Sequence, residues 1–100
     1  MKIMVIDDVM MNILVLKQSV KAFGTVDGFQ GWEAGLSALR EAYESGDQYD
    51  LLFLDILMPV RNGLEVLKDV QEIGRQHAVG RKTKVVMLTS ISEPGSVREA

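Results

Sequence analysis

The chain lacks cysteine, carries a single histidine and has only two prolines in 100 residues. Without cysteine, neither a disulfide nor a thiolate metal site is available, which fits a reducing cytoplasm. No apolar run approaches the roughly 20 residues that a membrane span needs. The N-terminus leads directly into an apolar strand without the pattern of a signal peptide. We therefore expect a cytoplasmic protein that does not enter a membrane.

The chain also lacks an excess of positive charge. Eleven Lys and Arg residues face 14 Asp and Glu residues, for a net charge of −3. This balance offers no electrostatic basis for binding nucleic acid or an anionic membrane surface. The hydrophobic fraction of 47% is enough for a packed core. At this length we expect one domain covering residues 1–100.

Short apolar segments alternate with longer segments whose apolar residues recur at helical spacing. The expected strands are residues 2–6, 25–29, 51–54 and 85–88, and the expected helices are about residues 10–22, 32–43 and 64–74. This alternation predicts a parallel sheet with helices on both faces. Pro94, in the segment from Glu93 to Gly95, is well placed for the first turn of one further helix before the chain ends.

Three aspartates directly follow two of the expected strands. Asp7 and Asp8 follow the first strand, and Asp55 follows the third. Taken singly, each aspartate is equally well explained as a helix cap or turn residue. If the strands are parallel neighbours, however, all three carboxylates meet at the edge where α/β sheets bind ligands. A hard divalent cation, above all Mg²⁺, would offset their repulsion, and such a site favours phosphoryl chemistry.

The residues around Asp55 carry a specific pattern. The run DILMPVRNGLE, residues 55–65, places Met-Pro three and four positions after the aspartate and Gly eight positions after it. This run resembles the phosphoacceptor loop of response-regulator receiver domains. The pair Asp7-Asp8 resembles their acidic pair, and Leu88-Thr89-Ser90 resembles the end of their fourth strand. The position of Asn12, four residues after the acidic pair, resembles the pattern of receivers that belong to or serve hybrid sensor kinases.

The resemblance implies a role for each matching residue. Asp55 would accept a phosphoryl group from a sensor histidine kinase or a phosphotransfer protein. Asp8 would bind Mg²⁺ directly, Asp7 directly or through water, and Leu57 through its backbone carbonyl. Thr89 would hydrogen-bond the phosphoryl group and switch a protein-interaction surface. The implied protein is a switch that catalyses its own modification, not an enzyme with turnover.

The implied fold is an α/β, flavodoxin-like, doubly wound parallel sheet with strand order 2-1-3-4. The family usually adds a fifth strand, a lysine at its end and a fifth helix, and this sequence ends at Ala100 before all of them. Lys82 and Lys84 precede the fourth strand and would lie at the opposite edge. We therefore expect residues 85–88 to form an exposed apolar edge.

Three explanations of this shortened pattern remain open. The chain is a piece of a longer receiver, or it pairs with a second copy or another chain that completes the sheet, or it is a degenerate receiver. In the last case it would act as a dimerisation or interaction module without phosphotransfer, which is the main alternative function. Affinity for Mg²⁺ separates the two functions, because a degenerate module need not bind the ion.

Two enzyme-like or cofactor-binding functions fit the sequence less well. A flavin-binding protein of this fold would need a phosphate-binding loop after the first strand, where Asp7 and Asp8 would repel a phosphate. A phosphatase of the haloacid-dehalogenase type would need a second aspartate two residues after the nucleophile. That position is occupied by Leu57.

Overall fold

The computed structural model describes residues 1–55, 63–77, 82–88 and 97–99. They form one sheet with the order β2-β1-β3-β4-β5. The strands are β1 (Lys2–Ile6), β2 (Thr25–Phe29), β3 (Leu51–Asp55), β4 (Lys84–Leu88) and β5 (Val97–Glu99). The helices are α1 (Met10–Val20), which continues as a 3₁₀ turn (Lys21–Phe23), α2 (Trp32–Glu44) and α3 (Gly63–His77). β1 to β4 are parallel, which confirms the predicted fold class and the order 2-1-3-4.

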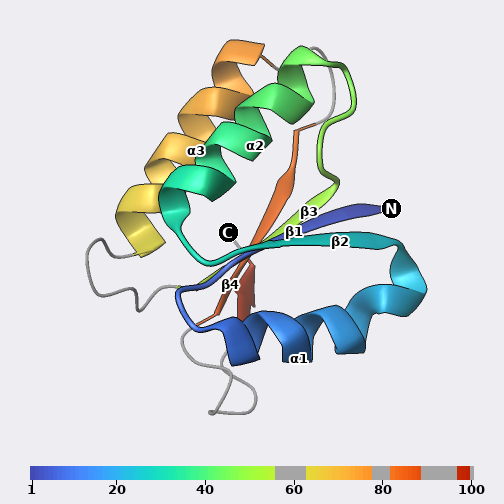
Figure 1. Cartoon of the computed structure of the whole chain (residues 1–100). Helices are drawn as coiled ribbons and strands as arrows, with labels where there is room; N and C mark the ends of the chain where they lie inside the picture. The colour runs from blue at the N-terminus through green and yellow to red at the C-terminus, as the bar shows by residue number, and fades with distance from the viewer. Residues whose placement is uncertain (56–62, 78–81, 89–96, 100) are drawn as a thin grey trace.

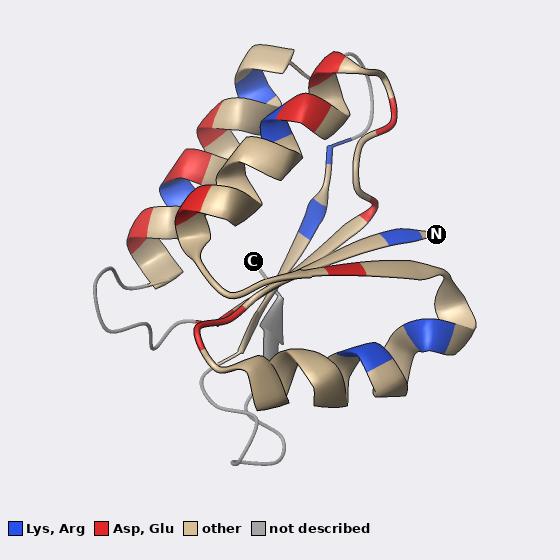
Figure 2. Ribbon diagram, in the orientation of Figure 1, with Lys and Arg blue, Asp and Glu red and all other residues tan. Residues whose placement is uncertain are grey.

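The helices lie on both faces of the sheet (Figure 1). α2 and α3 pack side by side on one face, and in the described part of the chain α1 is the one helix on the other. The charges of α2 and α3 are of both signs and are spread along the two helices (Figure 2). Among the described residues, no helix combines the length and the apolar character that crossing a bilayer requires.

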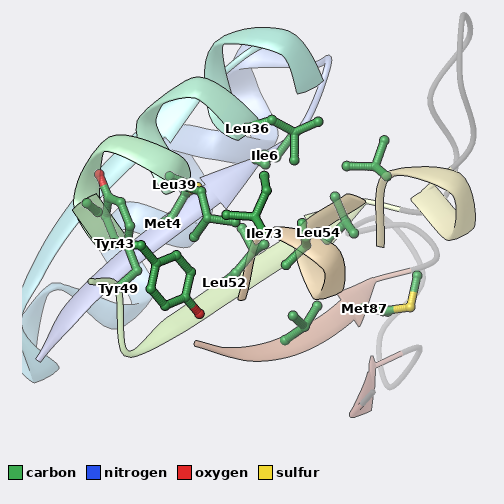
Figure 3. Close-up of a cluster of buried hydrophobic side chains, with 14 residues drawn as sticks. Met4, Ile6, Leu36, Leu39, Tyr43, Tyr49, Leu52, Leu54, Ile73 and Met87 are labelled. Atoms are coloured by element: carbon green, nitrogen blue, oxygen red, sulfur yellow. The ribbon is translucent and has the colours of Figure 1, made fainter. Parts of the chain in front are cut away.

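The main core lies between the sheet and the pair α2–α3 (Figure 3). The strand register places side chains of β1, β3 and β4 in rows across the sheet, because Met4 pairs with Leu52 and Leu52 pairs with Val85. All three side chains are at least 95% buried. The other face is less fully covered, since Phe53 and Val86 are only half-buried. The complete burial of Ile6 and Leu54, at the ends of β1 and β3, fixes the positions of the residues that follow them.

The C-terminal segment differs from the prediction in one respect. Val97–Glu99 forms a short strand, antiparallel to Val86–Leu88 of β4, where we expected a helix to continue. β4 is therefore not an open edge along these three residues, and Met87 and Leu88 are each only 5% exposed. The parallel fifth strand of the family's pattern is absent from the described residues, and an antiparallel strand occupies that edge. Because ladder hydrogen bonds form in either direction, an apolar edge accepts a strand that local helix signals do not foretell.

α1 is seated against β2 by a close approach at Gly28. A Cβ at this position would lie 2.3 Å from Cγ2 of Ile13, the buried side chain at the start of α1. Only glycine lets helix and strand come this near without displacement. This contact sets how far α1 stands from the end of β1.

We expect Gly28→Ala to destabilise the fold by about 1–3 kcal/mol, because Ile13 is β-branched and has little freedom to move aside. Urea unfolding would measure this cost. A double-mutant cycle with Ile13→Ala supplies the control, since the cost of Gly28→Ala should largely disappear when Ile13 is truncated. An equal cost in both backgrounds would show that the contact is not responsible.

Candidate metal site at the carboxyl edge of the sheet

Two neighbouring strands deliver three carboxylates to one place. Ile6 of β1 pairs with Leu54 of β3, so Asp7 and Asp55 directly follow paired residues. Asp8 is the next residue after Asp7. One carboxylate oxygen from each of the three aspartates lies within 4.8 Å of the other two. The predicted convergence of Asp7, Asp8 and Asp55 is therefore found in the structure. In Figure 2 the acidic segment after β1 lies beside the start of α1.

The three aspartates differ in exposure. Asp7 is 1% exposed and Asp55 is 6% exposed, whereas Asp8 is partly open to solvent. Burial, above all, raises the pKa of Asp7, and the charge of Asp8 adds to this rise. Hydrogen bonds with the Val9 backbone, the Asn12 side chain and the Asp55 side chain act in the opposite direction on the pKa. Within the described part of the chain, no lysine or arginine acts on the pKa of Asp7.

Asp7 holds the turn into α1 instead of capping the helix. Its Oδ1 accepts a hydrogen bond from the Val9 backbone N–H at 2.9 Å. The cap position itself is Val9, and no side chain caps the helix there. The capping explanation for Asp7 and Asp8 is thus wrong for α1. The Asp7 backbone N–H donates to the Phe29 carbonyl at 3.1 Å, which ties this turn to the end of β2.

The sequence did not assign a function to Asn12 at the site. Its Nδ2 lies 3.4 Å from Oδ1 and 3.3 Å from Oδ2 of Asp7. Asn12 is half-buried in the first turn of α1. The signal available in the sequence was an amide five residues after a strand-end aspartate, which is too common a spacing to assign a contact.

The donor set fits a hard divalent cation. Clustered carboxylate oxygens are the ligands that Mg²⁺ and Ca²⁺ prefer, and nitrogen and sulfur ligands are absent from this group of three. Lys84 begins β4 opposite Leu51, whereas Asp55 pairs with Leu88 at the other end of that strand. This lysine is therefore at the opposite edge, as expected, and does not neutralise the cluster.

Two predicted site residues, Leu57 and Thr89, lie outside the described residues. Thr89 directly follows Leu88, the register partner of Asp55. The roles predicted for Leu57 and Thr89 stay predictions.

Comparison with known proteins identifies the family. The model of the response regulator receiver domain matches residues 3–100, nearly the whole chain. The chain therefore belongs to the response regulator receiver domain family, whose members act in two-component signalling and interact with histidine kinases or phosphotransfer proteins.

A curated relative and two solved structures are similar to this chain. Hybrid signal transduction histidine kinase L of Dictyostelium discoideum is 32% identical over 81 residues, which are 80% of this chain but 5% of that kinase. The receiver domain of the Arabidopsis thaliana histidine kinase CKI1, complexed with Mg²⁺ and BeF₃⁻, superposes with a TM-score of 0.76 at 23% identity. That alignment covers 95% of this chain and 68% of the CKI1 chain, and it supports the fold.

The second structure is the response regulator TrrA of Thermotoga maritima in complex with Mg²⁺–BeF. It is 31% identical, with a TM-score of 0.63, and the alignment covers 85% of this chain and 66% of the TrrA chain. At this identity the likeness extends to the sequence as well as to the fold.

The raised pKa of Asp7 gives a prediction for stability without divalent cations. The folded state binds the Asp7 proton more tightly than the unfolded state, so the ionised carboxylate costs stability at neutral pH. This cost disappears as the pH falls below the ordinary value of 3.8. We expect Asp7→Asn to be more stable than the parent in EDTA at pH 7, with a gain that shrinks toward pH 4.

Urea unfolding of both proteins across this pH range would measure the gain. If the variant were less stable than the parent at pH 7, the ionised Asp7 carboxylate would not destabilise the folded state.

Proposed function

We propose that this receiver domain accepts a phosphoryl group on Asp55 from a phosphohistidine, with Mg²⁺ held by Asp7, Asp8 and Asp55. The observation that supports this most directly is the convergence of the three carboxylates within 4.8 Å at the carboxyl edge of the sheet. Ligands of open α/β sheets bind at this edge. The same residues resemble the acidic pair and the phosphoacceptor aspartate of the family.

In the proposed transfer, an oxygen of the Asp55 carboxylate attacks the phosphorus of the phosphohistidine. The bond between phosphorus and the imidazole nitrogen breaks, and its electron pair returns to the ring. The product on this chain is an acyl phosphate at Asp55. The protein contributes mainly position, because phosphoryl transfer needs little other covalent work. Asp55 is 6% exposed, and one of its carboxylate oxygens lies within 4.8 Å of an oxygen of Asp7.

A bound Mg²⁺ would supply charge neutralisation for the phosphoryl oxygens and for the three carboxylates. Asp8 suits entry of the ion, since it is the most exposed of the three residues. The buried residues Asp7 and Asp55 would supply the other two carboxylate ligands. The Leu57 carbonyl and the Thr89 hydroxyl belong to the same proposal as a further metal ligand and as the residue that senses the phosphoryl group.

The relatives support both the ion and the partner. TrrA, with 31% identity, was crystallised in complex with Mg²⁺–BeF, and a second relative is a hybrid histidine kinase. We infer that the phosphoryl donor here is a sensor histidine kinase or a phosphotransfer protein. The chain would be modified once per signal, as an acceptor and not as an enzyme with turnover.

The alternative function, an interaction module without phosphotransfer, has one observation in its favour. Apolar side chains are exposed at the start of α1, with Met11 at 65% and Leu14 at 51% exposed. Single exposed apolar residues are common, but a group of them on one helix suits a protein partner. This alternative requires neither Mg²⁺ nor a reactive Asp55.

Intact mass after incubation with acetyl phosphate and Mg²⁺ tests the proposal. We expect the parent to gain the mass of one phosphoryl group and Asp55→Asn to gain none. Asp47→Asn is the matched control, because Asp47 is an exposed aspartate outside the site, and it should be modified like the parent. A folded parent that gains no mass, or an Asp55→Asn variant that gains as much, would refute the proposed phosphoacceptor.

Mg²⁺ titration by calorimetry separates this proposal from the alternative. We expect one ion to bind the parent and binding to be lost in Asp8→Ala, since the variant removes the most accessible carboxylate. Parent protein that binds no Mg²⁺ would favour the interaction module.

A further inference from the structure

Two donors in the turn into α1 hold the carboxylate of Asp7, which also hydrogen-bonds with the side chain of Asp55. The Val9 N–H and one Asn12 proton both point to Oδ1, at 2.9 and 3.4 Å, and Asn12 also lies 3.3 Å from Oδ2. Val9 is a backbone donor that any residue at that position except proline would supply. Asn12 donates from its side chain, and its amide reaches both oxygens.

Water is poorly placed to replace Asn12. Asp7 is 1% exposed, so a donor lost from its side chain leaves a buried charge with fewer hydrogen bonds. Charge-assisted hydrogen bonds are the ones that fix a carboxylate most strongly. We therefore expect removal of the Asn12 amide to change the orientation of the Asp7 carboxylate more than it changes the packing around that carboxylate.

The position of Asn12 is set by the packing of α1. The next residue, Ile13, is 2% exposed and meets β2 at Gly28, where no side chain intervenes. The helix also begins with hydrogen bonds from the backbone N–H groups of Asn12 and Ile13 to the Val9 carbonyl, at 3.1 and 3.3 Å. The Asn12 amide is thus carried on a fixed helical turn beside the strand end that bears Asp7.

We propose that Asn12 is a positioning residue that orients the Asp7 carboxylate toward the cation shared with Asp8 and Asp55. This inference rests on the proposed function, because it assumes that the three carboxylates bind Mg²⁺. Residues that hydrogen-bond to metal ligands typically contribute 10–100-fold to metal affinity. The long Asn12 contacts place the expected effect near the lower end of that range.

The experiment compares Mg²⁺ affinity, by calorimetry, in the parent, Asn12→Leu and Asn12→Gln. Leucine fills similar space without a donor, whereas glutamine keeps an amide. We expect Asn12→Leu to weaken Mg²⁺ binding about tenfold and Asn12→Gln to recover part of the loss. Gln18→Leu is the matched control, since it removes an exposed amide from the same helix, and its affinity should equal that of the parent. Asn12→Ala replaces the leucine variant should that one not fold.

Urea unfolding in EDTA separates positioning from a structural role. A loss of stability in Asn12→Leu with unchanged Mg²⁺ affinity would overturn the inference, because Asn12 would then only support the fold. Glutamine that binds no better than leucine would also overturn it, since the amide would not be the cause. Absence of Mg²⁺ binding in the parent would refute the proposed function and this inference together. If only the role of Asn12 is wrong, the parent still binds Mg²⁺ and is still phosphorylated.

Discussion

The structure depends on the register of β1 and β3, which holds three carboxylates in one place. β1 and β3 are neighbours in a fixed register, so Asp7 and Asp55 cannot separate without breaking the pairing of Ile6 with Leu54, both of which are fully buried. Burial makes the ionised form of Asp7 costly, and among the residues that the structure describes no lysine or arginine acts on it. A fold that keeps such an arrangement loses stability unless a cation enters, and this is the property that a metal-dependent phosphoacceptor requires.

The rest of the molecule serves to make this edge rigid. The apolar core beneath α2 and α3 buries β1, β3 and β4 together, and Gly28 lets α1 approach β2 closely enough to bring its first turn beside Asp7. Donors from that turn then fix the Asp7 carboxylate. Tyr49, in the segment before β3, donates to Asp27 of β2 at 2.6 Å, and Thr83 donates to the Tyr49 carbonyl at 2.6 Å. These bonds tie the segments that lead into β3 and β4 to the sheet.

Much of the fold and of the site followed from residue pattern. Continuous apolar runs identified β1, β3 and β4, and the aspartates after β1 and β3 converge because parallel strands end at one edge.

β5 could not be predicted, because Pro94 and its neighbours favour a helix locally while pairing with β4 is a tertiary effect. α3 extends to His77, beyond its last apolar residue, because ion pairs such as Arg75 with Glu72 support a helix without apolar spacing. The contact of Asn12 with Asp7 depends on how α1 sits against Gly28, which no local pattern encodes.

The central claim is that the clustered carboxylates cost stability until a divalent cation binds them. The most direct measurement is the urea unfolding midpoint of the parent as Mg²⁺ is raised at constant ionic strength. The account predicts that the midpoint rises steadily once Mg²⁺ exceeds its dissociation constant, with a gain of about 2.7 kcal/mol at a hundredfold excess over that constant. A midpoint that does not change with Mg²⁺, in a protein that is folded throughout, would contradict it.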